Sequence, residues 1–217
     1  SLRSALDGLD RVEDPELKAK LIAVAKDDVV RLDRLIGDIS EAARTDAELA
    51  RARFEPVDLG PVIEQLVQGW EHRREKGDAR LAFARPRKAT AVVLGDASRL
   101  VRAIDNIIDN AISFSPSGGL VEIAAGRVGD TVRIRVDDEG PGVPEDAREA
   151  IFNRFHSVRP EEEHFGRHTG LGLAIARSIV RVHGGDISVE SEPHRFTKFT
   201  LRIPARPLEP ARRAPAA

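Results

Sequence analysis

Two asparagines, Asn106 and Asn110, are spaced so that both lie on one face if their segment is a helix. Ile107 and Ile108 lie between them and can anchor the opposite face in a core. A side-chain amide oxygen is a hard, neutral ligand, suited to a magnesium ion that keeps part of its water shell and carries phosphates. Taken alone, such a pair is more often solvated or capping, so the residues downstream decide its meaning.

The run Asp138-Glu139-Gly140-Pro141-Gly142 follows a strand-like segment. A carboxylate here can accept a hydrogen bond from the exocyclic amine of adenine, which guanine lacks at that edge. The glycines would let the backbone approach the base. The alternative is an ordinary turn at a strand end, which Asp and Gly also favour. We expect the neighbouring Asp137 to point to the other face of the strand.

A second glycine-containing run, Thr169-Gly170-Leu171-Gly172-Leu173, opens a predicted helix. Free N–H groups and partial positive charge at a helix N-terminus can bind phosphate without a cationic side chain. The alternative is a helix start packed on the sheet. Residues 156–168 just before it are polar and aperiodic, and a loop of this length is usually functional or disordered. We interpret its histidines as solvated residues of this loop, not as metal ligands.

Together with Ile151-Phe152-Asn153-Arg154-Phe155, these segments resemble the N, G1, F and G2 boxes of the catalytic domain of bacterial sensor histidine kinases. That domain belongs to an ATP-binding superfamily shared with DNA gyrase, heat-shock chaperone and mismatch-repair ATPases. The resemblance implies that ATP and Mg²⁺ bind here, that Asp138 recognises adenine and that Arg154 reaches the phosphates beneath a lid. The implied nucleotide-binding residues, of which Asn110 and Asn106 would also hold the metal, are Asn106, Asn110, Ser113, Phe114, Asp138, Gly140, Gly142, Arg154, Thr169, Gly170, Leu171, Gly172 and Leu173.

Two positions depart from the family pattern. Ser113 stands where relatives often carry Lys or Arg, which predicts weaker phosphate binding unless Arg154 or Arg159 compensates. The segment from Glu192 to Lys198 replaces a late glycine-containing segment of many relatives, which puts one supporting turn in question.

The first part of the chain predicts a helical hairpin. Apolar residues recur at three- and four-residue steps from Pro15 to about Ala50, and Ser1 to Arg11 has a similar pattern. Glu13-Asp14-Pro15 forms a short break between the two segments. A dimeric four-helix bundle would cover both apolar stripes, so residues 1–53 are predicted to be a partial dimerisation and phosphotransfer hairpin.

From Phe54 the pattern alternates between helices and strands, which predicts an α+β fold: a sandwich with helices on one face of a mixed sheet. Asp58 and Asp96 are expected N-caps. Residues 54–204 are therefore predicted to be the ATP-binding domain, and residues 205–217 a disordered tail. The predicted helices span 59–74, the region after Asp96 and 171–183, and the predicted strands lie around 81–84, 91–94, 121–123, 132–136, 187–190 and 199–203.

Composition excludes several classes of function. The 217 residues contain no Cys, so disulfides and thiolate metal sites are excluded. The net charge of -2 provides no electrostatic drive towards nucleic acid. No apolar run approaches the ~20 residues of a membrane span. The absence of Met indicates a fragment of a longer protein.

The resemblance also predicts what surrounds this chain. The phosphoacceptor histidine is expected just upstream of Ser1, so the chain should bind Mg-ATP without phosphorylating itself. The parent would be a homodimeric sensor kinase that passes phosphate to the receiver domain of a response regulator. This chain would be its cytoplasmic portion, held at the inner membrane by upstream segments. The alternatives are another ATPase of the superfamily and a non-enzymatic dimerising scaffold.

Overall fold

The computed structural model describes residues 14–25, 29, 54–75, 77–87, 90–156 and 170–206. The chain divides into two compact units, residues 1–46 with 159–169, and residues 47–158 with 170–217. In the first unit, residues 15–25 form a helix that starts at Pro15, as predicted, with the Asp14 carboxylate accepting a hydrogen bond from the Glu16 N–H at 2.9 Å. The predicted helix over residues 1–11 and the continuation towards Ala50 lie outside the described residues.

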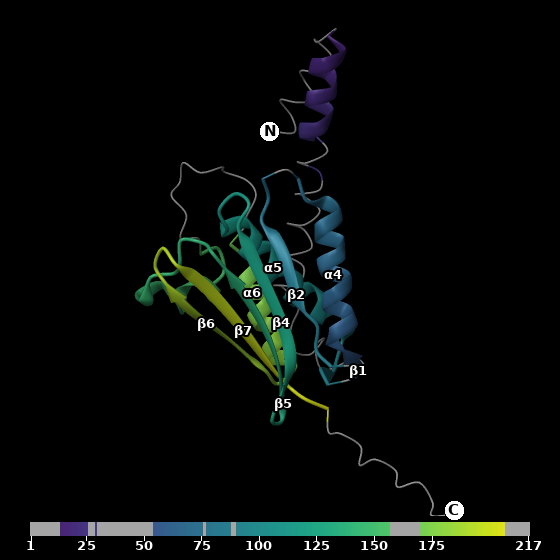
Figure 1. The fold of residues 1–217 in the computed structure, drawn as a ribbon, viewed down its shortest axis with the longest axis vertical. Helices are drawn as coiled ribbons and strands as arrows, with labels where there is room; N and C mark the ends of the chain where they lie inside the picture. The colour runs from purple at the N-terminus through teal and green to yellow at the C-terminus, as the bar shows by residue number, and fades with distance from the viewer. Residues whose placement is uncertain are drawn as a thin grey trace, which may run out of the picture. The chain divides into compact units, whose positions relative to one another are not determined.

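The second unit contains the predicted helices and strands in the predicted order, preceded by a strand over Glu55–Asp58 that the sequence pattern does not predict, and its α+β class is confirmed (Figure 1). Short 3-10 turns cover Glu145–Ala147 and Ala150–Phe152. The helices and strands are β1 (Glu55–Asp58), α4 (Leu59–Arg73), β2 (Arg80–Ala84), β3 (Val92–Gly95), α5 (Ala97–Phe114), β4 (Leu120–Val128), β5 (Thr131–Asp138), α6 (Gly172–Val182), β6 (Asp186–Glu192) and β7 (Phe196–Pro204).

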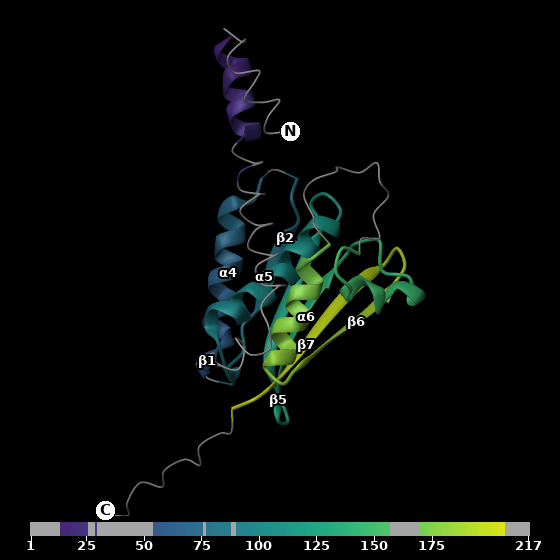
Figure 2. The same ribbon diagram turned by 180° about the vertical axis from the view of Figure 1, so that it is seen from behind.

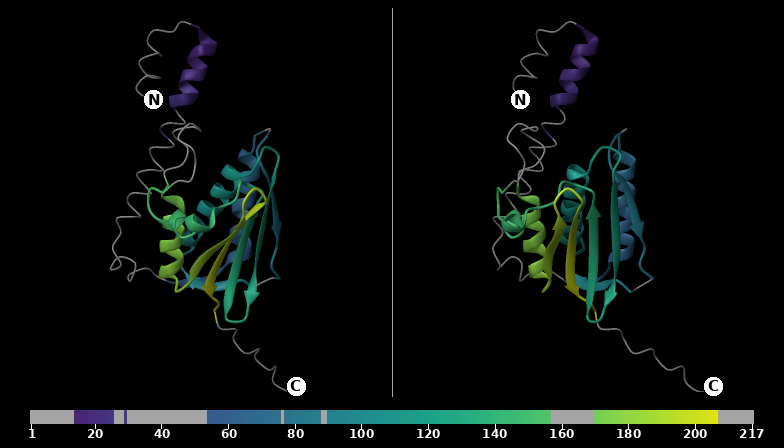
Figure 3. Two further views of the ribbon diagram at one scale, coloured as in Figure 1. Left: turned by 90° about the vertical axis from the view of Figure 1, so that its left-hand side faces the viewer. Right: turned by 60° about the vertical axis from the view of Figure 1, so that its left-hand side comes forward.

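The main sheet is mixed and has the strand order β2-β4-β5-β7-β6. Strand β2 runs parallel to β4, and every other neighbouring pair in this sheet is antiparallel. Helices α4, α5 and α6 cover one face, as Figure 2 shows from the helix side. Figure 3 shows the helix layer against the sheet layer in two further views. Strands β1 and β3 form a separate antiparallel pair.

Alternation along β5 explains how the sheet faces the helices. Val132, Ile134 and Val136 are buried, whereas Arg133 and Arg135 are exposed. The same alternation places Asp138 on the buried side, at the end of the strand. The two-residue alternation along β5 therefore places the Asp138 carboxylate in the interface between the sheet and the helices.

Helices α5 and α6 supply an aliphatic core, and Ile107 and Ile108 are fully buried, as predicted. In α6 the buried stripe is Ile175, Ala176, Ile179 and Val180. Val182, which the spacing places on the buried side, is only half-buried because the helix ends there.

The end of the second unit is held to the rest of the domain. The Ala205 N–H donates to the Asp130 carbonyl at 2.8 Å, and the Arg206 N–H donates to the Val92 carbonyl at 2.9 Å. The first two residues of the predicted tail therefore still pair with the domain, and residues 207–217 lie outside the described part. Among the helices that the structure describes, none is both long and apolar enough to span a bilayer.

Candidate functional site

Asp138 is a buried carboxylate at the end of β5, with 3% of its surface exposed. Burial raises its pKa to about 6, although hydrogen bonds from the Gly140 backbone and the Thr197 side chain act in the opposite direction. The Gly140 N–H donates to Asp138 Oδ1 at 2.9 Å. A carboxylate has about four acceptor positions, so two such bonds leave capacity for a ligand donor. Asp138 can therefore accept a hydrogen bond from a buried amine.

Asp137 points to the opposite face, as the alternation predicts. Its Oδ2 atom lies 2.9 Å from Nε of Arg135. Burial raises its pKa, and the Arg135 charge counteracts that effect. The two adjacent aspartates therefore have different environments, and only Asp138 lies on the helix side of the sheet.

The turn after Asp138 requires glycine at two positions. A Cβ on Gly140 would lie 2.7 Å from Asp138 Oδ1 and 3.0 Å from the Phe114 carbonyl oxygen. Gly142 has a φ of 81°, and a Cβ there would lie 2.8 Å from the Glu192 carbonyl oxygen. The turn thus packs closely between the end of α5 and the start of the β6–β7 connection.

Helix α5 presents both asparagines as half-buried residues. The Nδ2 atom of Asn106 is buried and has no hydrogen-bond partner in the described structure. A Cβ on Gly172 would lie 3.7 Å from the Asn106 Oδ1 atom, so the start of α6 faces this amide. Ser113 Oγ donates to the Asn110 carbonyl at 3.0 Å, which uses its proton within the helix. The unpaired Asn106 amide is a donor that a ligand could satisfy.

The start of α6 differs from those of the other two helices in this unit. Asp58 caps α4 and Asp96 caps α5, as predicted, through side chains that accept N–H bonds. Among the residues that the structure describes, no side chain caps α6. Its first N–H groups, at Gly172 and Leu173, have no side-chain acceptor from those residues, which is the arrangement that binds phosphate at helix N-termini. Buried Leu171 anchors this end in the core.

A backbone hydrogen bond joins Phe155 to Gly170, the residue at which the described chain resumes. The Phe155 N–H donates to the Gly170 carbonyl at 2.9 Å. Both residues have positive φ, 62° and 67°. Arg154 is exposed immediately before this junction. Thr169 lies outside the described residues.

The late segment that departs from the family pattern forms a turn and contacts the site. His194 has a φ of 59°, and its N–H donates to the Pro141 carbonyl at 2.8 Å. Thr197 lies opposite Asp138 in the β5–β7 ladder. Sequence reasoning missed Thr197 as a partner of Asp138, because nothing local in the sequence reveals the register of strands distant in the chain.

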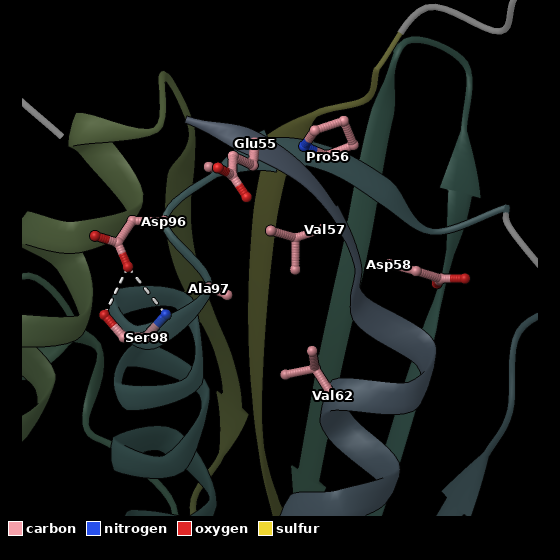
Figure 4. A pocket seen from close by; sticks show the side chains of 9 residues that line it. Glu55, Pro56, Val57, Asp58, Val62, Asp96, Ala97 and Ser98 are labelled. Atoms are coloured by element: carbon pink, nitrogen blue, oxygen red, sulfur yellow. Dashed lines mark hydrogen bonds between the residues drawn. The ribbon is translucent and has the colours of Figure 1, made fainter. Parts of the chain in front are cut away.

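A cavity of about 510 Å³ lies near the other end of α5 (Figure 4). Asp96 at its edge accepts hydrogen bonds from Ser98 N at 2.9 Å and Ser98 Oγ at 2.6 Å. None of the candidate nucleotide residues contributes to it, so it is distinct from the predicted site. The lining residues are Glu55, Pro56, Val57, Asp58, Val62, Gly95, Asp96, Ala97 and Ser98.

Residues 95–207 match the family model described as histidine kinase-, DNA gyrase B-, and HSP90-like ATPase. The chain belongs to this family. A solved mycobacterial sensor histidine kinase, MprB, is 31% identical, covering 71% of this chain and 99% of its own, with a TM-score of 0.59. Members of this family are ATPases by description, and the fold here is that of their ATP-binding domain.

Similarity to the sensor-kinase branch extends beyond the ATPase domain. The sensor protein ChvG of Agrobacterium fabrum is 39% identical over 216 residues, which is 94% of this chain and 36% of ChvG. Full-length ShkA, solved in complex with AMPPNP, is 27% identical with a TM-score of 0.70 over 90% of this chain and 40% of its own. The chain spans between 36% and 53% of the length of ChvG and of other curated relatives like it. It contains the catalytic domain of a bacterial two-component sensor histidine kinase.

Proposed function

We propose that this chain binds Mg-ATP between α5, α6 and the turn that follows β5. Asp138 accepts a hydrogen bond from the adenine amine, and the Gly140 and Gly142 turn supports the base. The single observation that carries this proposal is the buried Asp138 carboxylate, which can accept a further hydrogen bond. Gly140, which has no Cβ, leaves its backbone open to the base beside this carboxylate. Phosphates are bound by the start of α6 at Gly172 and Leu173 and by the preceding Gly170 and Leu171, and the sequence also assigns Thr169 and Arg154 to this role. Ser113 and Phe114 line the site at the end of α5.

The residues present fit a hydrated magnesium ion held by asparagine and phosphate oxygens. Among the described residues, no cluster of three or more His, Cys, Asp or Glu side chains could hold a metal. Magnesium needs few protein ligands when phosphates and water complete its octahedron. Asn110 supplies an amide oxygen from one face of α5. Asn106, whose buried Nδ2 lacks a partner, supplies an oxygen to the metal and a donor to a phosphate or water.

The proposed reaction is transfer of the γ-phosphoryl group of ATP to a histidine outside the ATPase domain and upstream of residues 1–53, which contain no histidine. The four histidines described are His72, His156, His183 and His194, and all of them lie in the second unit. His183 is buried and His72 is exposed on α4. We therefore assign none of these four as the acceptor. Magnesium would neutralise charge on the transferred group, and the residues of this chain orient it.

The partner proposed for the second transfer is the receiver domain of a response regulator, whose aspartate takes the phosphoryl group. The sensor-kinase relatives support this assignment. We also propose that residues 1–53 pair with those of a second copy in a homodimer. Upstream segments of the parent would hold it at the inner membrane, with this portion in the cytoplasm.

Calorimetric titration with ATP, with and without Mg²⁺, tests the nucleotide site. Asp138→Asn is expected to weaken ATP binding by about 10- to 100-fold, because the amide presents a donor where the adenine amine needs an acceptor. The matched control is Asp137→Asn, an adjacent carboxylate on the opposite face. Asn110→Ala is expected to abolish the gain in affinity that Mg²⁺ provides.

Equal affinities for wild type and Asp138→Asn would contradict the proposed adenine contact. Steady phosphate release from ATP would favour another ATPase of the superfamily, and absence of any ATP binding would favour the dimerising scaffold. Radiolabel from γ-labelled ATP on any of the six histidines of this chain would overturn the proposed location of the acceptor.

A further inference from the structure

Three residues on adjacent strands form a row beneath the turn that follows Asp138. Asp138 lies opposite Thr197 in the β5–β7 ladder, and Thr197 lies opposite Ser191 in the β6–β7 ladder. Directly opposed residues of neighbouring strands place their side chains on the same face. The row therefore runs from the buried carboxylate to the edge strand β6.

The Ser191 hydroxyl makes two hydrogen bonds, one as acceptor and one as donor. It accepts from the Val143 N–H at 2.8 Å and donates to the Phe196 carbonyl at 2.8 Å. A hydroxyl has one proton to donate, so both roles are filled without competition. Ser191 thus joins the far end of the turn to the β6–β7 connection, as Gly140 joins its near end to Asp138.

Other contacts hold the turn and the segment that follows it against β6 and the β6–β7 connection. The His194 N–H donates to the Pro141 carbonyl, and Arg148 Nη2 donates to the Ser191 carbonyl at 2.7 Å. A Cβ on Gly142 would lie 3.0 Å from Ser191 Oγ, so the backbone approaches this hydroxyl closely. The position of the turn is therefore set from β6 as well as from β5.

We propose that Ser191 is a positioning residue for purine recognition, holding the turn of residues 139–143 so that Asp138 and Gly140 meet adenine in one geometry. This inference rests on the proposed function of the site. Without the hydroxyl, the Val143 N–H and the Phe196 carbonyl lose their partner, and the turn is free to shift away from Asp138. Discrimination between adenine and guanine should then fall together with affinity.

The test is calorimetric titration of the whole chain with Mg-ATP and with Mg-GTP. Ser191→Ala is expected to raise the Kd for ATP about 3- to 10-fold and to reduce the ratio of GTP to ATP Kd values. Ser191→Thr, which keeps the hydroxyl, should restore both quantities. Ser188→Ala is the matched control, because Ser188 lies on the same strand and its Oγ accepts from Arg202 Nη1 at 2.7 Å away from the turn.

A general loss of stability would lower the melting temperature without changing the ratio of the two Kd values. If Ser191→Ala does not fold, Ser191→Cys makes the same comparison, since a thiol is a weak donor and acceptor. Unchanged affinity and selectivity in the folded variant, or an equal loss in Ser188→Ala, would overturn the positioning role alone. Absence of ATP binding by the wild-type chain would overturn the proposed function and this inference with it.

Discussion

The His183 ring accepts a hydrogen bond from the Asp96 N–H through Nε2, at 3.1 Å, and so joins the end of α6 to the start of α5. Its Nδ1 lies 2.7 Å from the Ile179 carbonyl, and the ring stacks on Phe54 with centroids 4.8 Å apart. A Cβ on Gly95 would lie 2.5 Å from His183 Cδ2, which explains the glycine at the end of β3. The imidazole is therefore neutral, with the proton on Nδ1.

Replacing His183 by Ala should lower the free energy of unfolding by about 2–3 kcal/mol, because two hydrogen bonds and a ring stack are lost. Urea unfolding followed by circular dichroism measures this change. His72→Ala, at an exposed position on α4, is the control and should change stability by less than about 0.5 kcal/mol. A change no larger than that of the control would show that His183 does not hold the two helices together.

The wild-type contribution of His183 should also depend on pH. Burial lowers the pKa of His183, while the Asp96 charge acts to raise it and the Arg99 charge to lower it. Below the ordinary value of 6.5 the unfolded chain takes up a proton that the folded chain does not, so stability falls as pH decreases through that window. The difference in unfolding free energy between wild type and His183→Ala should therefore be smaller at pH 5.5 than at pH 7.5.

Asp138→Asn should weaken ATP binding and yet stabilise the fold at neutral pH. Burial raises the folded pKa of Asp138 from 3.8 to about 6, so the unfolding free energy of wild type falls as pH rises between these values. At ~1.4 kcal/mol per pKa unit, the variant is expected to gain up to about 3 kcal/mol over wild type at pH 7. Urea unfolding at pH 5 and pH 7 measures the gain, which should be smaller at pH 5. A variant less stable than wild type at pH 7 would contradict this account.

Gly170→Ala should disturb the junction with Phe155. A Cβ there would lie 2.9–3.0 Å from backbone atoms of Phe155 and His156, in addition to the strain of a φ of 67°. Gly118 is the control, because it has a φ of 71° but nothing within 4 Å of an added Cβ. Gly118→Ala should cost about 1–2 kcal/mol from the backbone conformation alone. Gly170→Ala should lower the stability measured by thermal unfolding more than Gly118→Ala does. Equal losses of stability would show that the backbone of Phe155 and His156 moves to accommodate the added Cβ.

Trp70 on α4 should stabilise the packing of α4 on α5, the helix that carries Asn106 and Asn110. Its Nε1 donates to Asp105 Oδ1 at 2.8 Å, immediately before Asn106. Trp70→Phe removes this donor and is expected to lower the free energy of unfolding by about 1–2 kcal/mol. Circular dichroism is the appropriate probe, because Trp70 is the only tryptophan. Gln68→Ala, at an exposed position of the same helix, should leave stability nearly unchanged.

Local patterns in the sequence determined the helices of the second unit, most of its strands, and the caps of α4 and α5. Asp58 and Asp96 cap their helices because a short acceptor side chain reaches the first N–H groups within two or three residues. The β4–β5 pair follows from alternating residues around the Gly129-Asp130 turn. The segments proposed to bind nucleotide were visible for the same reason, since each is a continuous run of residues.

Only the tertiary structure decided how these segments meet. The row from Asp138 through Thr197 to Ser191 depends on the register of strands far apart in the sequence, and no local pattern specifies that register. The same holds for the start of α6 at Gly172 facing Asn106 and for His183 joining α5 to α6. Sequence patterns act over a few residues, whereas the position of Asp138 in the site depends on packing between elements that only the folded chain brings together.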